Sequence, residues 1–436
     1  MDSIVVETVP EERALADERP RRRVDPVTLL VLICLALFAA LVRLPRLQTP
    51  SNMIFDEIYY AKAAEQYLAR VEITEERTHP PLSKLIIAVG IVLFGDNAVG
   101  WRIMGAIAGT LLALVVYGLA ATLFRDRFVA AASALLVSLD GLAFVESRIS
   151  KPDISLTLFL FGSYAAFWQY LRRRLDQPEE PTGRNIGWLY LAGVAAGCAV
   201  STKWTTVVPL AVIPVMLALL GGWGRITLPR ADLRHLAAAF TVVPVVVYLL
   251  TYIPYFRLGH NPREWVALQV SMYQFHASLT EGHPYQSQWW SWPLLIRPIW
   301  YEYYEAAPQV NRGILAIGNP ILWWASLPAF AVVAARASRV RAMPETFLVA
   351  GFLISYVQYA FITRALFLYH FLPALPFLVM GLAAVLARVR ARVGDGVVLV
   401  FLLLVIGWFV AFYPVLSALP IAAPRMNRLM WFGSWI

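Results

Sequence analysis

Two adjacent carboxylates, Asp56 and Glu57, follow the first membrane-length apolar run of this 436-residue chain. Charged groups beside an apolar helix bundle are costly unless a partner or a reaction uses the charge. A positioned carboxylate can accept a proton from a hydroxyl as it attacks, which typically contributes about 10²–10⁴-fold to a reaction rate. The structural alternative for Asp56 is a helix N-cap. We expect the pair to mark a functional site.

Two cations, Lys203 and Arg364, each lie almost alone between two apolar runs. A half-buried cation needs an anionic partner, which is either a protein carboxylate or a phosphate brought in by a lipid. Other polar residues fall on the same predicted face of the membrane, and their convergence favours a phosphate site. These residues are His79, Lys84, Glu146, Arg148, Lys151, Asp153, Tyr369 and His370.

An aromatic segment between His283 and Trp292 reads HPYQSQWWSW. Its three tryptophans form either an aromatic belt at the membrane interface or a stacking platform for a sugar ring, and residue types alone leave both open. The candidate contacts for a sugar or an acceptor are His283, Gln288, Trp289, Trp290 and Trp292.

The composition indicates a polytopic α-helical membrane protein, because 59% of the residues are hydrophobic and only 15% are charged. Both cysteines, Cys34 and Cys198, lie inside apolar runs, which argues against a disulfide framework or a metal site. Eleven membrane spans are predicted, near residues 27–42, 101–123, 128–145, 152–171, 186–201, 204–220, 235–255, 314–335, 345–362, 366–387 and 396–413.

Arginines supply most of the net charge of +9, and they cluster in alternate loops on the side of the N-terminal tail. The positive-inside rule makes that side the cytoplasm and puts the C-terminus and the candidate site outside. The apolar segment 82–94 is too short to span, so we expect it to lie in the outer interface. The predicted organisation is a disordered tail over 1–25, without a cleavable signal peptide, then a catalytic membrane module over 26–255, an outer loop over 256–313 and a four-helix module over 314–436.

A series of motifs resembles the protein O-mannosyltransferases, most closely their bacterial (actinobacterial-type) members. The motifs, in chain order, are FDEIYYAKAAEQYL from Phe55, HPPLSKLIIAVGIVLFG from His79, WRIMGAIAGTL from Trp101, ESRISKPDISLTLF from Glu146, STKWTTV from Ser201, the aromatic segment, GNPILWW from Gly318 and RALFLYHFLPALPFL from Arg364. These enzymes are glycosyltransferases of family 39 and the GT-C superfamily. The resemblance therefore implies an all-α GT-C fold with about eleven transmembrane helices and interfacial helices in the first outer loop.

The resemblance also implies a reaction: inverting transfer of mannose from polyprenyl-phosphate-mannose to Ser or Thr hydroxyls of secreted or membrane proteins at the extracytoplasmic face of a bacterial plasma membrane. Asp56 matches the family's general base, and Glu57 would orient acceptor or sugar hydroxyls. Lys203 and Arg364 are the preferred ligands of the departing phosphate; Lys84, Arg102, Arg148 and Asp153 are further candidates for the donor site, and Tyr369 and His370 would contact phosphate or sugar. The acceptor would be a Ser/Thr-rich polypeptide, reached at the translocon. No cofactor is required; a divalent ion on Asp56, Glu57 and Asp153 is the alternative.

Two rival functions fit parts of the pattern. Another lipid-phosphate-dependent GT-C glycosyltransferase, which adds aminoarabinose or arabinose to a glycolipid, would share the Asp-Glu pair and the cations. A lipid-carrier transporter would instead place charges near the membrane midplane and show inverted repeats, and the sequence shows neither.

Overall fold

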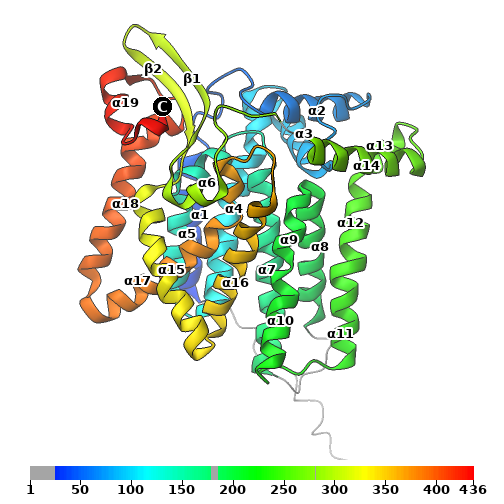
Figure 1. Ribbon diagram of the computed structural model, residues 1–436, viewed down its shortest axis with the longest axis vertical. Helices are drawn as coiled ribbons and strands as arrows, with labels where there is room; N and C mark the ends of the chain where they lie inside the picture. The colour runs from blue at the N-terminus through cyan, green and yellow to red at the C-terminus, as the bar shows by residue number, and fades with distance from the viewer. Residues whose placement is uncertain (1–24, 178–184, 280) are drawn as a thin grey trace, which may run out of the picture.

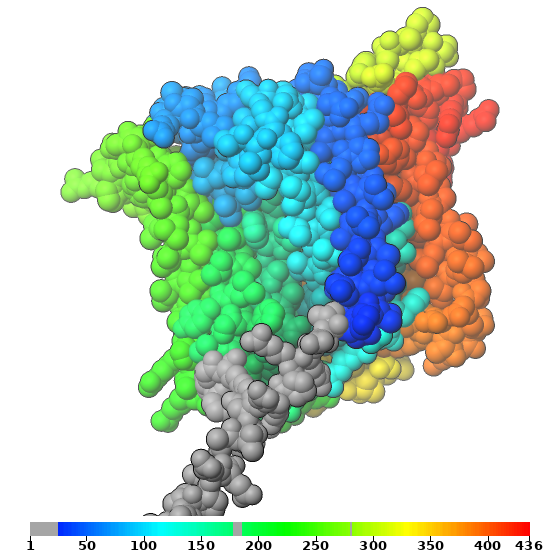
Figure 2. All heavy atoms as spheres, turned by 180° about the vertical axis from the view of Figure 1, so that it is seen from behind, coloured from blue at the N-terminus to red at the C-terminus, as the bar shows by residue number. Residues whose placement is uncertain are grey.

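The computed structural model describes residues 25–177, 185–279 and 281–436 of the chain. Figure 1 shows a bundle of long helices that carries short helices and a β-hairpin at one end. We call this the hairpin end. Figure 2 shows the hairpin projecting beyond the bundle at this end, while α13 and α14, in green, project to the other side. Apart from Asp25, the predicted tail over 1–25 lies outside the described residues.

The first part of the chain alternates long helices with short ones. Its helices are α1 (Pro26–Arg43), α2 (Glu57–Ala69), α3 (Leu82–Phe94), α4 (Ala98–Phe124), α5 (Arg127–Ser138), α6 (Gly141–Glu146), α7 (Asp153–Asp176) and α8 (Ile186–Thr202). They continue with the 3₁₀ turn η3 (Trp204–Thr206), α9 (Val207–Leu210), α10 (Val212–Gly222), α11 (Arg230–Ala237), the π-helical turn η4 (Ala238–Val242), α12 (Val243–Thr251), α13 (Ile253–Arg257) and α14 (Pro262–Ser278).

The second part begins with the 3₁₀ helix η5 (Trp289–Leu294) and the strands β1 (Ile299–Ala307) and β2 (Val310–Ala316). It continues with α15 (Pro320–Val340), α16 (Met343–Val357), the 3₁₀ turns η6 (Gln358–Phe361) and η7 (Leu368–Phe371), α17 (Leu375–Val393), α18 (Asp395–Leu416), β3 (Ile421–Ala422), α19 (Ala423–Leu429) and η8 (Gly433–Trp435).

Short polar side chains cap the N-termini of several long helices. Asp25 accepts hydrogen bonds from the backbone amides of Val27 and Thr28 at the start of α1. Asn97 and Asn319 cap α4 and α15 in the same way. These caps satisfy amides that would otherwise lack a partner within the helix, so the sequence sets where each helix begins.

Seven helical segments among the described residues are long and apolar enough to cross a membrane. The predicted total of eleven spans stays a prediction, because helices such as α5 and α8 are apolar but shorter. Two predicted spans begin too early. The span over 314–335 starts inside β2, and its helix begins only at Pro320; the span over 366–387 includes η7, and α17 begins at Leu375, with Pro376 in its first turn.

The fold is mostly helical, as expected, and a small antiparallel sheet that was not predicted is added to it. Its strand order is β1-β2-β3, and β1 pairs with β2 from Ile299 opposite Ala316 to Ala307 opposite Val310. The predicted loop over 256–313 therefore contains the end of α13, α14, η5 and most of a hairpin. The aromatic run Trp300, Tyr301, Tyr303 and Tyr304 in β1 has the high β propensity that allows this strand.

Helix α3 packs closely against α4 through two glycines. A Cβ atom at Gly90 would lie 2.3 Å from the carbonyl oxygen of Gly100, and one at Gly100 would lie 1.9 Å from that of Gly95. Neither position tolerates a side chain unless the backbone moves. With 13 residues, α3 has the length expected of an interfacial helix. Figure 1 shows α2 and α3 at the hairpin end, whereas the α10–α11 and α15–α16 turns lie at the opposite end.

Candidate active site

Asp56 lies at the hairpin end, directly before α2. Its side chain makes no hydrogen bond to the first amides of the helix, so it does not act as the N-cap that we considered as the alternative. Its Oδ2 atom instead lies 4.0 Å from the Nζ atom of Lys151. Burial raises the pKa of Asp56, and Lys151 opposes that rise. The carboxylate is half-buried, which leaves it open to an approaching hydroxyl.

Lys151 is the centre of a buried cluster of charges. Its Nζ atom lies 3.5 Å from Oε1 of Glu146 and 3.7 Å from Oδ2 of Asp153. It also donates a hydrogen bond of 3.0 Å to the hydroxyl of Tyr301, which in turn donates to Glu146. Glu146 ends α6, Asp153 begins α7 and Tyr301 lies in β1, so the cluster joins three separate elements to the start of α2.

Asp153 extends this cluster toward the second predicted cation. Its Oδ1 atom accepts a hydrogen bond of 3.0 Å from Nζ of Lys203, the residue that follows α8. Both lysines lie over the ring of Tyr369, with Nζ of Lys151 3.4 Å and Nζ of Lys203 5.5 Å from its centroid. Ion pairs thus run without interruption from Asp56 through Lys151 and Asp153 to Lys203.

A cavity of about 470 Å³ begins at Lys203. Arg364 and the histidines His79 and His276 also line it, together with apolar and aromatic side chains from α9, α14 and η6. Burial, together with the nearby His79 and Arg364, lowers the pKa of His276 to about 4, so His276 is neutral at physiological pH. Its Nδ1 atom accepts from Nη1 of Arg364 at 3.3 Å, and its Nε2 atom donates to the carbonyl oxygen of Thr78 at 2.8 Å. The cavity therefore presents two cations and the mixed polar and apolar lining that a lipid-borne phosphate requires.

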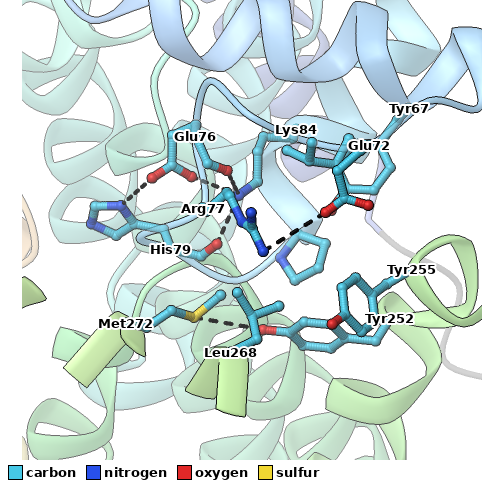
Figure 3. Close-up of a pocket in the computed structure, with 12 residues that line it drawn as sticks. Tyr67, Glu72, Glu76, Arg77, His79, Lys84, Tyr252, Tyr255, Leu268 and Met272 are labelled. Carbon is cyan, nitrogen blue, oxygen red and sulfur yellow. Dashed lines mark hydrogen bonds and ion pairs between the residues drawn. The ribbon is translucent and has the colours of Figure 1, made fainter. Parts of the chain in front are cut away.

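Lys84 is not free to bind a phosphate in this conformation. Figure 3 shows its ammonium group among the side chain of Glu76 and the carbonyl oxygens of Glu76 and His79. The three distances are 2.6, 2.9 and 2.7 Å. Burial would raise the pKa of Glu76, but Lys84 and His79 outweigh it and hold the pKa below its ordinary value. The pair fixes the loop before α3 and places His79 on the cavity wall.

Glu57 and Arg102 are paired with each other. Nε and Nη2 of Arg102 donate to the two carboxylate oxygens of Glu57 at 2.8 and 2.7 Å. Glu57 also accepts from the backbone amides of Ile54 and Ser150. Arg102 donates further to the carbonyl oxygens of Leu47, Pro50 and Asn52. Both side chains are buried and fully engaged, so they join the first loop to α4 rather than face a substrate.

Arg148 is engaged in a similar way. Its guanidinium group donates to the carbonyl oxygens of Arg43, Pro45 and Arg46 just after α1, and it lies 5.2 Å from the ring centroid of Phe144. It thereby satisfies carbonyl groups at the end of α1. The structure therefore brings Asp56, Asp153, Lys203, Arg364 and Tyr369 together, and it places Glu57, Lys84, Arg102 and Arg148 in the surrounding framework.

The three tryptophans of the aromatic segment do not form one stacking platform. Trp292 is buried and lies parallel to His370, Trp289 packs against Tyr356, and Trp290 is 55% exposed. His370 is buried too, and its Nδ1 atom accepts from the amide of Phe367. These contacts hold η7 and therefore Tyr369 in place.

The other two candidate contacts in the aromatic segment are His283 and Gln288. His283 contacts Phe55, the residue before Asp56, edge-on, with ring centroids 6.5 Å apart. Gln288 precedes η5, and its carbonyl oxygen accepts from Ser291.

Four contributors to the site were not among the predicted site residues. Lys151 and Glu146 were noted only as polar residues of the outer face, and His276 and Tyr301 were not singled out. Tyr301 is 150 positions from Lys151, and no local pattern links them. His276 ends an amphipathic segment that carries a clear capping box at Asn261, which is the one sequence signal for an ordered helix there. Among the described residues, no group of three or more His, Cys, Asp or Glu side chains is arranged to hold a metal ion.

Family models match nearly all of the described chain. The model for dolichyl-phosphate-mannose-protein mannosyltransferase matches residues 33–101 and 93–259. The model for the C-terminal four-transmembrane region of protein O-mannosyltransferase matches residues 262–435.

Curated relatives and solved structures agree with these matches. Polyprenol-phosphate-mannose–protein mannosyltransferases from Mycolicibacterium smegmatis and Mycobacterium tuberculosis are both 27% identical; the first alignment covers 91% of each chain, and the second covers 98% of this chain and 99% of the relative. The yeast Pmt1–Pmt2 complex bound to its sugar donor has a TM-score of 0.81 at 16% identity, over 94% of this chain and 93% of that one. ArnT from Cupriavidus metallidurans, bound to undecaprenyl phosphate, has a TM-score of 0.60 at 19% identity, over 84% and 61%.

Proposed function

This chain belongs to the dolichyl-phosphate-mannose–protein mannosyltransferase family, and we propose that it transfers mannose from a polyprenyl-phosphate-mannose donor to Ser or Thr hydroxyls of acceptor proteins, with Asp56 as the general base. The names of the mycobacterial relatives support this donor and a protein acceptor. The observation that carries the proposal is the half-buried carboxylate of Asp56, linked by ion pairs to a cavity that holds Lys203 and Arg364.

In the proposed reaction, the acceptor hydroxyl attacks the anomeric carbon of the mannosyl group on the face opposite the phosphate. The new bond joins the acceptor oxygen to this carbon, and the bond from the carbon to the phosphate oxygen breaks. The bonding electrons leave with the phosphate, and the hydroxyl proton passes to Asp56. One displacement of this kind inverts the anomeric configuration.

The cations have a different task from the base. A lipid phosphate is already a good leaving group, so the site needs positive charge at the place where negative charge develops. Lys203 and Arg364 supply it from two sides of the cavity. Lys151 and Lys203 both lie over the ring of Tyr369 and both pair with Asp153, but only Lys203 lines the cavity, so the base and the phosphate ligands occupy adjacent but distinct positions.

The membrane setting follows from the same arrangement. The chain has several membrane-length apolar helices, and the site lies at the hairpin end, away from the arginine-rich turns. We propose that this end faces outward from a bacterial plasma membrane and that the N-terminus is cytoplasmic. The carrier would lie along the bundle with its phosphate in the cavity, while the acceptor polypeptide approaches from the aqueous side.

A transfer assay tests the function and the base together. Membranes containing the chain receive labelled polyprenyl-phosphate-mannose and a Thr-rich peptide, and labelled peptide is measured. The wild type is expected to transfer, and Asp56→Asn is expected to lower the rate by about 10²–10⁴-fold, because an amide cannot accept the proton. Glu75→Gln is the control: Glu75 is an exposed carboxylate in the loop after α2, and the rate of this variant is expected to equal that of the wild type. Equal rates for Asp56→Asn and wild type would remove Asp56 as the base, and no transfer by wild type would contradict the proposed reaction.

A further inference from the structure

Lys151 is the cation that pairs with Asp56, and the proposed reaction gives it no role yet. Its side chain is 1% exposed and lies within 4.0 Å of three carboxylates, those of Asp56, Glu146 and Asp153. A lysine with so little access to water persists only where its charge is compensated. It does not line the cavity that holds Lys203 and Arg364, so it is not placed to bind the donor phosphate.

Several contacts fix the position of its ammonium group. It donates to the hydroxyl of Tyr301 at 3.0 Å and sits 3.4 Å from the centroid of the Tyr369 ring. The rings of Tyr301 and Phe55, which stack on each other, lie 4.7 and 5.2 Å from it. Cation–π contacts of this kind are strongest where water is excluded. The ammonium group is therefore held in one place beside the base.

We propose that Lys151 is a positioning residue that keeps Asp56 ionised and orients its carboxylate toward the acceptor hydroxyl. This inference rests on the proposed function, because it concerns the group that we assign as the base. Its physical reason is that an opposite charge within about 4–6 Å of a carboxylate favours the charged form by about 1–3 pK units.

Other groups also face Asp56, and their effects have different signs. Asp153, from α7, raises its pKa, while Lys203, after α8, and His79, before α3, lower it. The phenol groups of Tyr60 and Tyr369 lie close enough to interact with it as well. After burial, Lys151 has the largest influence on this carboxylate, and Lys203 is already paired with Asp153.

The sign of the expected effect follows directly. Asp56 acts as a base only when it is ionised, so the rate falls as the pH drops through its pKa. Burial already places that pKa above its ordinary value, and loss of Lys151 raises it further. The acid limb of the profile of kcat/KM against pH is therefore expected to move to higher pH by about 1–3 units when the lysine charge is removed.

The experiment compares the pH profiles of purified wild-type enzyme, Lys151→Met and Lys151→Arg, with labelled polyprenyl-phosphate-mannose and the Thr-rich peptide. Lys151→Met removes the charge and keeps most of the chain length, so its activity is expected to be low at neutral pH and partly restored at higher pH. Lys151→Arg keeps the charge, and its acid limb is expected to lie at a pH close to that of the wild type. Should Lys151→Met not fold, Lys151→Gln replaces it and tests the charge alone.

Lys84→Met is the matched control. Lys84 is an equally buried lysine with its own carboxylate partner, Glu76, but it does not contact Asp56. Its loss is expected to reduce the amount of folded enzyme and to move the acid limb less than Lys151→Met does, because Lys84 reaches Asp56 only through the position of His79. An unmoved limb in Lys151→Met, with an active wild type, would overturn the role of Lys151 and leave the proposed function intact. An inactive wild type would instead contradict the proposed function itself.

Discussion

Arg102 and Arg364 carry the same guanidinium group, but their surroundings give them opposite roles. Arg102 donates to one carboxylate and three backbone carbonyl groups, and its side chain is buried. Arg364 lines an open cavity, and its one side-chain hydrogen bond in the described residues goes to a neutral histidine, His276. A buried ion pair stabilises the fold only while both partners are present, whereas an arginine without a carboxylate partner can bind an incoming anion.

This difference predicts separate effects of two matched substitutions. Arg364→Gln is expected to raise the KM for the polyprenyl-phosphate donor about 10-fold or more, because a hydrogen bond to a charged group is worth about 1.5–3 kcal/mol and about 1.4 kcal/mol is a factor of ten. Arg102→Gln is expected to lower thermal stability instead, because breaking a buried ion pair costs about 3–5 kcal/mol. Donor titrations and fluorescence-detected unfolding in detergent measure the two effects. A KM for Arg364→Gln equal to that of the wild type would exclude Arg364 as a phosphate ligand.

Residue types in the sequence could predict the chemistry of the site but not the pairing within it. Asp56, Lys203 and Arg364 were predicted to converge, and the structure places them around one cluster and its cavity. The sequence could not show that backbone carbonyl groups near α1 occupy Arg148, since those groups are the same in every residue. Nor could it show that Tyr301 reaches Lys151 across 150 positions, because the hairpin itself was not predicted.

At the scale of elements, the short helices and turns carry the site, and the long helices support it. The site residues lie at the start of α2 and α7, after α8, in η7 and at the base of β1. The extent of α3 could be predicted from the apolar segment 82–94, and the GT-C fold could be predicted from the motif series. The late start of α17 could not be predicted, because η7 continues the apolar run that leads into α17, and its packing of His370 against Trp292 joins residues far apart in the sequence.

The packing of α3 against α4 gives a test at this scale. Gly90→Ala is expected to destabilise the protein by about 1–3 kcal/mol, because its Cβ atom would lie 2.3 Å from a backbone oxygen of α4 and the helices would have to separate. The loop that carries Glu76 and His79 should shift with α3, because Lys84 in α3 donates hydrogen bonds to both residues. Gly118→Ala, in α4, is the control: no atom lies within 4 Å of its Cβ position, so its unfolding temperature should match or exceed that of the wild type. Equal losses of stability in Gly90→Ala and Gly118→Ala would argue against close packing of α3 on α4 as the cause.

At the scale of the whole molecule, charge and chemistry are separated between the two ends of the bundle. The turns between α10 and α11 and between α15 and α16 carry arginines and lie opposite the hairpin end. The ion-pair cluster and its cavity lie near the hairpin end. Such a polarity sets the orientation of a membrane protein through its basic loops.

Cysteine labelling tests the orientation. The two native cysteines, Cys34 and Cys198, are first replaced by serine, and single cysteines are then placed at Gln309 in the hairpin turn and Arg125 after α4. A membrane-impermeant maleimide is expected to label Gln309→Cys in intact cells and Arg125→Cys only after permeabilisation. The reverse pattern would show that the hairpin end faces the cytoplasm and would contradict the proposed outward position of the site.

The ion pair between Asp153 and Lys203 has a consequence for the lipid carrier. The carboxylate of Asp153 is an internal anion that pairs with the cation expected to receive the phosphate. The phosphate of an arriving carrier must displace Asp153 from Lys203. When the carrier leaves, the ion pair between Asp153 and Lys203 forms again. Exchange of one counterion for another means that neither arrival nor departure leaves an uncompensated charge next to lipid. Selectivity then depends on which anion competes better, so a dianionic free carrier should hold the site longer than the monoanionic sugar-loaded one.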